Sequence, residues 1–200
     1  MTYRPATLIS RDMGQFREST AVRSFFSVMF KGREATRQGA FIYNSIVEQA
    51  RRPEFYAGLD VPDTMDGRFD LIVLHAGLYL PRLKAVKQDG NRLSQAMFDQ
   101  MFANLEFNLR ELGVGDVGVP RRMKDMLQAF YGRVASYDSA LRTGDMPQLR
   151  AALHRNVYRG AEVDPARVDA LASYVRAAAE SLKAADDDVI VAGAFAWPAP

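Results

Sequence analysis

Apolar side chains recur every three or four residues along most of the chain, the spacing that places them on one face of an α-helix. The clearest run predicts a helix from residue 94 to 112, whose apolar stripe consists of Phe98, Phe102, Leu105, Leu109 and Leu112. Gly113 follows that stripe, where a left-handed cap residue is common. The next helix begins at Pro120, which suits a first turn, and its longer stripe consists of Met123, Met126, Leu127, Phe130, Val134, Tyr137 and Leu141.

The same spacing predicts four further helices. Asp164 and Pro165 form a capped start for a helix whose stripe ends at Leu182, and a shorter helix occupies 147–158. Residues 40–51 are apolar on more than one side, which predicts a buried helix. The segment 67–84 is apolar all round, so we expect it to be the central helix of the core, with Pro81 bending or ending it.

This succession of helices, with no alternating strands, predicts an all-α fold rather than a parallel α/β sheet. A chain of 200 residues suits a single compact multi-helix domain. We expect a loose, flexible segment at 1–20, the helical domain at 21–184 and a C-terminal tail at 185–200. The tail is short and apolar, and its sequence leaves open whether it packs on the helices or stays mobile.

Composition excludes several classes of protein. The chain has no cysteine, so disulfides, cysteine-ligated metals and cysteine nucleophiles are absent. Its 26 basic residues are nearly balanced by 24 acidic ones without a long basic run, which argues against specific nucleic-acid binding. The most apolar stretch, at 71–80, is about half the length of a membrane-spanning helix. The first residues do not resemble a signal peptide, and we expect a cytoplasmic protein.

Two features that suggest chemistry have plainer structural interpretations. Gly113, Gly115 and Gly118 match the dinucleotide-binding pattern G-x-G-x-x-G, but a helix rather than a strand precedes them, which favours a tight turn between helices. The two histidines, His75 and His154, lack partners at metal-ligand spacing. We expect His75 to be a hydrogen-bonded core residue and His154 to face solvent. The sequence indicates no catalytic constellation, metal site or cofactor.

Two segments have features of interaction surfaces. Phe107 lies opposite the apolar stripe of its helix, so it either packs against a neighbouring helix or is an exposed aromatic in a partner-binding patch. The segment 22–30 is a short amphipathic element with basic residues around it. It is either an amino-terminal helix docked on the body or a peripheral membrane contact, for which the candidate residues are Phe25, Phe26, Met29, Phe30, Lys31 and Arg33.

The chain also carries an ordered series of short motifs, at 53–56 (PEFY), 61–70 (VPDTMDGRFD), 108–116 (NLRELGVGD), 130–133 (FYGR) and 155–158 (RNVY). In order and spacing these motifs resemble the ubiquinol–cytochrome c chaperone family of α-proteobacteria and mitochondria. The resemblance runs from about residue 25 to residue 160. The residues that carry it include Tyr56, Asp63, Arg68, His75, Gly113, Gly115, Tyr131, Gly132, Arg133, Asn156 and Tyr158.

The resemblance implies a non-enzymatic assembly factor that helps to build ubiquinol–cytochrome c reductase by holding newly made cytochrome b. It implies no cofactor, a location in the cytoplasm or at the surface of the inner membrane, and, as further partners, a second assembly chaperone and the ribosome exit region. The alternative is an all-α carrier that holds a quinone, lipid or haem between the helices at 67–84 and 94–112. A third hypothesis is an enzyme that uses His75 with Asp63 or Asp70.

We place the client-binding surface at the glycine turn between the two best-defined helices. An apolar groove with a charged rim suits a nascent membrane protein, and the residues around the turn are Phe107, Arg110, Glu111, Asp116, Arg121, Arg122 and Lys124. In the competing interpretation Arg110, Glu111 and Arg133 form structural ion pairs that brace the helices.

Overall fold

A computed structural model of the chain describes the backbone from residue 20 and the side chains from residue 32. The segment predicted to be flexible at 1–20 lies outside the described residues, apart from the backbone of Thr20. The side chains of five membrane-contact candidates also lie outside the description, and only Arg33, which is exposed, lies within it. By its contacts the chain divides into two units, Met1–Glu34 and Ala35–Pro200, and the second unit contains all the sites described below.

Seven α-helices and one short π-helix account for the regular structure of residues 20–200. They are α1 (Thr20–Ala50), the π-helix η1 (Glu54–Gly58), α2 (Met65–Ala85), α3 (Gly90–Glu111), α4 (Gly118–Thr143), α5 (Met146–Asn156), α6 (Pro165–Ala184) and α7 (Asp187–Ala192). No strand occurs in this range, which confirms the all-α prediction for the described part of the chain. The bounds of α2 to α6 lie within four residues of the predicted ones.

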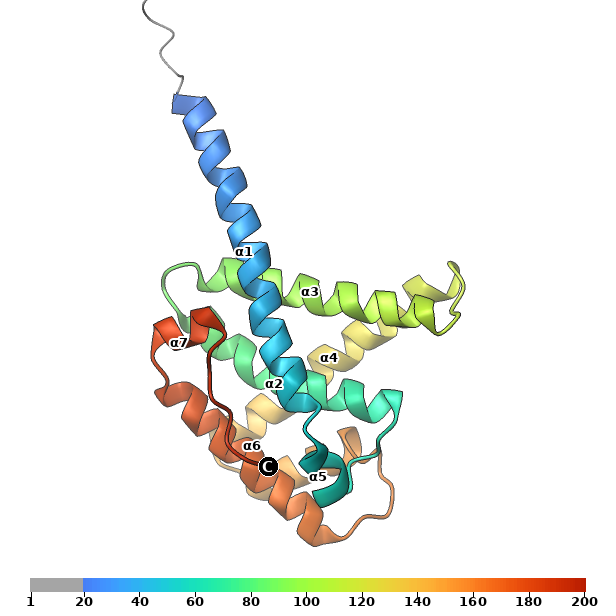
Figure 1. Ribbon diagram of the computed structural model, residues 1–200. Coiled ribbons are helices and arrows are strands. Elements are labelled where there is room, and N and C mark those ends of the chain that lie inside the picture. Colours follow the sequence, from blue (N-terminus) through green and yellow to red (C-terminus); the bar gives the residue numbers. More distant parts are fainter. Residues whose placement is uncertain (1–19) are drawn as a thin grey trace, which may run out of the picture. The chain divides into compact units, whose positions relative to one another are not determined.

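The centre of the second unit is α2, as the apolar composition of 67–84 predicted. Every residue from Leu71 to Leu80 is buried, and α2 packs against α3, α4, α6 and α7 (Figure 1). The Thr64 side chain caps its first turn by accepting a hydrogen bond from the Gly67 backbone N–H at 3.1 Å. Because such a helix has no polar face over ten residues, it is stable only when other helices surround it.

Local signals in the sequence fix the starts of α5 and α6. The Asp145 carboxylate accepts a hydrogen bond from the Gln148 N–H at 2.8 Å, and Asp164 accepts one from the Ala166 N–H at 2.9 Å. A proline lies in the first turn of both helices, where its missing N–H leaves no bond unmade. Upstream of α5, α4 ends at Thr143 and is capped by Gly144, whose φ of 69° lies in the left-handed region that favours glycine.

One prediction about helix ends is wrong, and one alternative left open is decided. The segment 22–30 is not a separate short element, because α1 is continuous from Thr20 to Ala50. The polar stretch in its middle is rich in good helix formers such as Glu34 and Arg37, so the loss of an apolar stripe does not end the helix. Of the two alternatives for Pro81, bending or ending the helix, the second is excluded, because α2 continues to Ala85. The Pro81 ring removes only one helix hydrogen bond, and the burial of flanking apolar residues outweighs that loss.

The C-terminal tail packs on the helices, which decides between the two alternatives left open by the sequence. The Tyr79 hydroxyl of α2 donates a hydrogen bond to the Ile190 carbonyl at 2.7 Å, and Phe195 is buried. The short helix α7 within the tail was not predicted. Its β-branched residues have modest helix propensity, so the helix depends on contacts with α2 that no local pattern reveals.

Candidate interaction surface and the networks behind it

We call residues 107–124 the α3–α4 corner, since they comprise the end of α3, the turn and the start of α4. Gly113 has a φ of 79°, and its N–H donates a hydrogen bond to the Arg110 carbonyl at 2.9 Å. The Gly118 N–H donates to the Gly115 carbonyl at 2.8 Å. The three glycines therefore build a tight turn between two helices, which confirms the structural interpretation of the G-x-G-x-x-G pattern.

The corner exposes apolar side chains. Three of the six large hydrophobic residues that are exposed in the described part of the chain lie here: Phe107 at 58%, Leu112 at 57% and Val117 at 94%. Phe107 does not pack against a neighbouring helix, so its interpretation as an exposed aromatic is confirmed. Leu112 was predicted as part of the buried stripe, but α3 ends at Glu111 and the chain turns away. Such a concentration of exposed apolar groups is typical of a binding surface.

Arg110 belongs to the framework of the corner. Its guanidinium contacts the Asp116 carboxylate at 2.6 Å and the Glu106 carboxylate at 2.9 Å. These ion pairs join the last turns of α3 to the turn that follows, so they hold the corner in shape rather than bracing one helix against another. Glu111 is exposed and forms no ion pair with the described residues, so the bracing role considered for it is not observed.

Three basic residues of the corner have no such partner. Arg121, Arg122 and Lys124 are exposed, and within the part of the chain that the structure describes they form no ion pair. They lie in the first two turns of α4, whose first turn contains no acidic residue. Positive charge at a helix N-terminus opposes the helix dipole and is mildly destabilising. These charges therefore do not serve the stability of the helix, and they are available to a partner.

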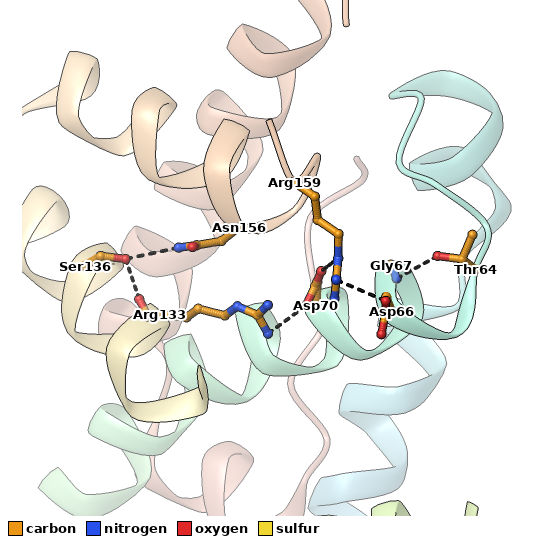
Figure 2. A network of polar contacts seen from close by, with 8 residues as sticks. All are labelled: Thr64, Asp66, Gly67, Asp70, Arg133, Ser136, Asn156 and Arg159. Atoms are coloured by element: carbon orange, nitrogen blue, oxygen red, sulfur yellow. Dashed lines mark hydrogen bonds and ion pairs between the residues drawn. The ribbon is translucent and has the colours of Figure 1, made fainter. Parts of the chain in front are cut away.

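The scaffold behind the corner is braced by a buried carboxylate, Asp70 of α2 (Figure 2). Its side chain is 0% exposed, and the Arg133 guanidinium of α4 approaches its Oδ1 at 2.7 Å. Arg159, from the loop after α5, donates a hydrogen bond from Nε to Oδ2 at 3.0 Å and contacts Asp66 at 3.0 Å. Arg133 also lies 5.4 Å from the centre of the Phe69 ring. The structural role considered for Arg133 is confirmed.

Other residues of the ordered motifs also have structural contacts. The Tyr56 hydroxyl donates a hydrogen bond to the Ala50 carbonyl at 2.8 Å, and the Tyr158 hydroxyl donates to the Leu59 carbonyl at 2.8 Å. These two bonds tie the segment around η1 to α1 and to the end of α5. Figure 2 also shows the Asn156 amide, which donates a hydrogen bond to the Ser136 hydroxyl at 3.3 Å.

The remaining motif residues lie on the surface. Asp63 and Arg68 form an exposed ion pair at 2.7 Å. Tyr131 is 59% exposed, and a Cβ added at Gly115 or Gly132 would meet nothing within 4 Å. These two glycines are therefore not required by close packing.

His75 is a fully hydrogen-bonded core residue, as predicted. Its Nδ1 lies 2.7 Å from the Leu71 carbonyl, which only accepts, so Nδ1 carries the proton. Nε2 then accepts from the Tyr174 hydroxyl at 2.7 Å, and that hydroxyl accepts from the Gln49 amide at 3.0 Å. Both ring nitrogens are therefore occupied by partners other than a carboxylate.

The hypothesis of an enzyme that pairs His75 with Asp63 or Asp70 finds no support in this arrangement. Asp63 is paired with Arg68, and Asp70 with two arginines. Within the described residues, no group of three or more histidine, aspartate or glutamate side chains is placed to hold a metal ion. The other histidine, His154, is half-buried, and its Nε2 lies 3.0 Å from the Ala161 carbonyl.

The buried groups Asp70 and His75 have pKa values shifted in opposite directions. Burial raises the pKa of Asp70 to about 6 against the opposing effect of Arg133 and Arg159. Because the folded protein then binds this proton more tightly than the unfolded chain, the stabilisation from Asp70 is complete below the ordinary carboxyl pKa of about 4. It is lost as the pH rises through 6. Burial lowers the pKa of His75 to about 4. Its contribution is complete above the ordinary histidine pKa of about 6.5 and is lost as the pH falls through 4.

We therefore expect the variants His75→Gln and Asp70→Asn to respond oppositely to acid. From pH 7 to pH 4, the unfolding free energy of His75→Gln, which keeps Asp70, should rise by about 2 kcal/mol through Asp70. Over the same range the unfolding free energy of Asp70→Asn should fall by about 3 kcal/mol through His75. Urea unfolding at several pH values measures both, and exposed carboxylates cancel in the difference between the variants. Parallel pH curves for the two variants would contradict these shifts.

These features define, for the described residues, an all-helical body that is braced internally and that exposes apolar and basic side chains at one corner. A sequence profile of the ubiquinol–cytochrome c chaperone family matches residues 57–197. The protein belongs to this family, which confirms the resemblance found in the ordered motifs. None of the described helices is long and apolar enough to cross a membrane.

Individual relatives agree with that assignment. Ubiquinol–cytochrome c reductase complex assembly factor 1 of Xenopus laevis is 27% identical over 157 residues, covering 78% of this chain and 78% of the relative. The human protein of the same name is also 27% identical, and the match covers 78% of this chain and 52% of the relative, so the chain spans about half its length. The crystal structure of the Cbp3 homolog from Brucella abortus is 37% identical, with a TM-score of 0.76, over 89% of this chain and 97% of that chain.

Proposed function

We propose that this protein is an assembly chaperone for ubiquinol–cytochrome c reductase, that it binds newly made cytochrome b through the α3–α4 corner, and that it catalyses no chemical step. Membership of the ubiquinol–cytochrome c chaperone family supports the assembly role. Relatives in frog and human carry the name of assembly factors for that complex. Cytochrome b as the client, and the corner as its binding surface, are our extension of that role.

One observation supports the choice of surface: the α3–α4 corner combines exposed apolar side chains with basic side chains that form no ion pair within the described residues. A membrane protein before insertion presents apolar helices together with polar loop ends. Phe107, Leu112 and Val117 offer apolar contact to such a client, and Arg121, Arg122 and Lys124 offer charge at the rim. Arg110 and Asp116 keep the turn in shape, so less ordering is needed on binding.

Further partners follow from the same role. A chaperone that receives a membrane protein as it is made works near the ribosome exit and the membrane surface, and a second assembly chaperone would cover the client surface that this chain leaves free. Glu111, exposed beside Arg110, is a candidate for contact with such a partner. We expect the contact with the membrane to be peripheral.

Site-specific crosslinking tests the proposed surface. A photoreactive phenylalanine at position 107 should form an adduct with newly made cytochrome b in cells, because Phe107 is 58% exposed on the α3 side of the corner. The same group at Glu180, an exposed residue of α6, is the matched control and should form none. Equal adducts at both positions, or none at 107 while the control reacts, would remove the corner from the proposal.

A further inference from the structure

The C-terminal segment Gly193–Pro200 lies on the helical body as a bound peptide would. It follows α7 and has no helix or strand of its own (Figure 1). Phe195 is buried and Trp197 half-buried, whereas Ala194 and Ala196 are exposed. Alternate burial is the pattern of an extended chain with one face on a surface. Peptides recognised in extended form use the same spacing of anchoring side chains.

The surface under the segment is aromatic and is held in place without it. The Trp197 ring lies 4.9 Å from the His75 ring and 6.0 Å from the Tyr79 ring, and the Phe195 ring lies 6.4 Å from Tyr79. His75 is fixed in turn by its hydrogen bonds to the Leu71 carbonyl and Tyr174. The body therefore presents a preorganised surface around the His75 and Tyr79 rings, which we call the seat. It accommodates two aromatic side chains that are separated by one residue along the chain.

Few polar contacts hold the segment on that seat. The Pro198 carbonyl accepts a hydrogen bond from the Gln49 amide at 3.3 Å. Within the described residues, the backbone groups of 195–197 form no hydrogen bond. The Trp197 indole N–H is buried without an acceptor, which is unfavourable in a protein interior. Beside it, an open pocket of about 420 Å³ is lined in part by Ser45, Glu48 and Trp197.

We propose that this seat is a second peptide-binding site, that the C-terminus occupies it in cis, and that an extended protein segment with aromatic residues at alternate positions displaces it. The resident segment itself defines the chemistry of the partner, because a segment with the same two anchors satisfies the same contacts. Gly193, with a φ of 67°, is the residue at which the C-terminal segment leaves α7. This site is separate from the α3–α4 corner, so it does not rest on the proposed client.

The chain's single tryptophan, Trp197, reports directly on whether the C-terminal segment occupies the seat. The probe is a synthetic peptide with the sequence of residues 194–200 and phenylalanine at the tryptophan position (AFAFPAP), so that all tryptophan emission comes from Trp197 of the full-length protein. We expect it to raise acrylamide quenching of Trp197 saturably, at millimolar concentration, because the cis segment competes at a comparable effective concentration. A peptide with alanine at both aromatic positions should have no effect.

The variant Phe195→Ala sharpens the test. Loss of one buried anchor weakens the cis segment, so the peptide concentration for half the effect should fall about tenfold or more, with an unchanged far-UV helix signal. If acrylamide quenching of Trp197 stays low at millimolar peptide in both the unmodified protein and Phe195→Ala, and rises only when the helices unfold, the proposal is overturned. A dimer that forms with increasing protein concentration while Trp197 stays shielded would assign the seat to a second copy and also overturn it.

Discussion

Replacing Arg133 by leucine is expected to lower the free energy of unfolding at pH 7 by about 3–5 kcal/mol. The Asp70 carboxylate is 0% exposed, and Arg133, whose side chain is 15% exposed, is the less solvated of its two cations. Arg159 would remain, but its side chain is 45% exposed, so solvent screens its charge. The buried Asp70 carboxylate would then keep its desolvation penalty and lose the nearer of its two compensating positive charges. Urea unfolding followed by circular dichroism measures the change.

Two controls separate this effect from a general loss of packing. In an Asp70→Asn background the same substitution should lose much less stability, since the uncompensated charge is absent. Arg142→Leu, which breaks an exposed ion pair with Asp138 in the same helix, should change the unfolding free energy by less than about 1 kcal/mol. Equal losses from Arg133→Leu in both backgrounds would show that the ion pair is not the cause.

Reversing two charges on the corner, in the variant Arg121→Glu/Arg122→Glu, is expected to weaken capture of newly made cytochrome b about tenfold or more. The uncommitted positive rim becomes negative, while the apolar groups and the framework pair Arg110–Asp116 stay in place. The melting temperature should stay the same or rise slightly, because acidic side chains in the first turn suit the helix dipole. Co-purification of the client with the tagged chaperone measures capture.

The matched control reverses two exposed charges elsewhere. Arg176→Glu/Lys183→Glu changes the net charge equally, on α6, and should leave capture unchanged. If both double variants reduce capture alike, net charge rather than the corner is responsible. If the corner variant captures as well as the unmodified protein, Arg121 and Arg122 have no part in client binding.

Most of the fold could be predicted because its signals are local. The stripes of α3 and α4, the Asp-Pro start of α6 and the wholly apolar α2 each place a helix by spacing or by a cap. The errors have two different causes. The middle of α1 has no apolar stripe and stays helical through the helix propensity of its residues, whereas α7 depends on its contacts with α2.

The candidate site was predictable only in part. The glycine turn and the position of Phe107 opposite its stripe located the exposed corner. The partners of Asp70 lie 63 and 89 residues away along the chain, in α4 and after α5, and no spacing rule connects them. An aspartate next to a long apolar run was nevertheless a usable signal, because a buried carboxylate requires a cation. Tyr174 and Gln49, which orient His75, gave no signal of this kind.

The central claim is tested most directly by the dithionite-reduced minus oxidised spectrum of membranes from the protein's own host, with the gene deleted and then restored. The assembly role predicts that deletion removes the b-type and c1-type signals of the reductase and leaves other cytochromes intact. The unmodified gene and the Arg176→Glu/Lys183→Glu control should restore them, and Arg121→Glu/Arg122→Glu should not. Normal b-type and c1-type signals in the deletion strain would contradict the account.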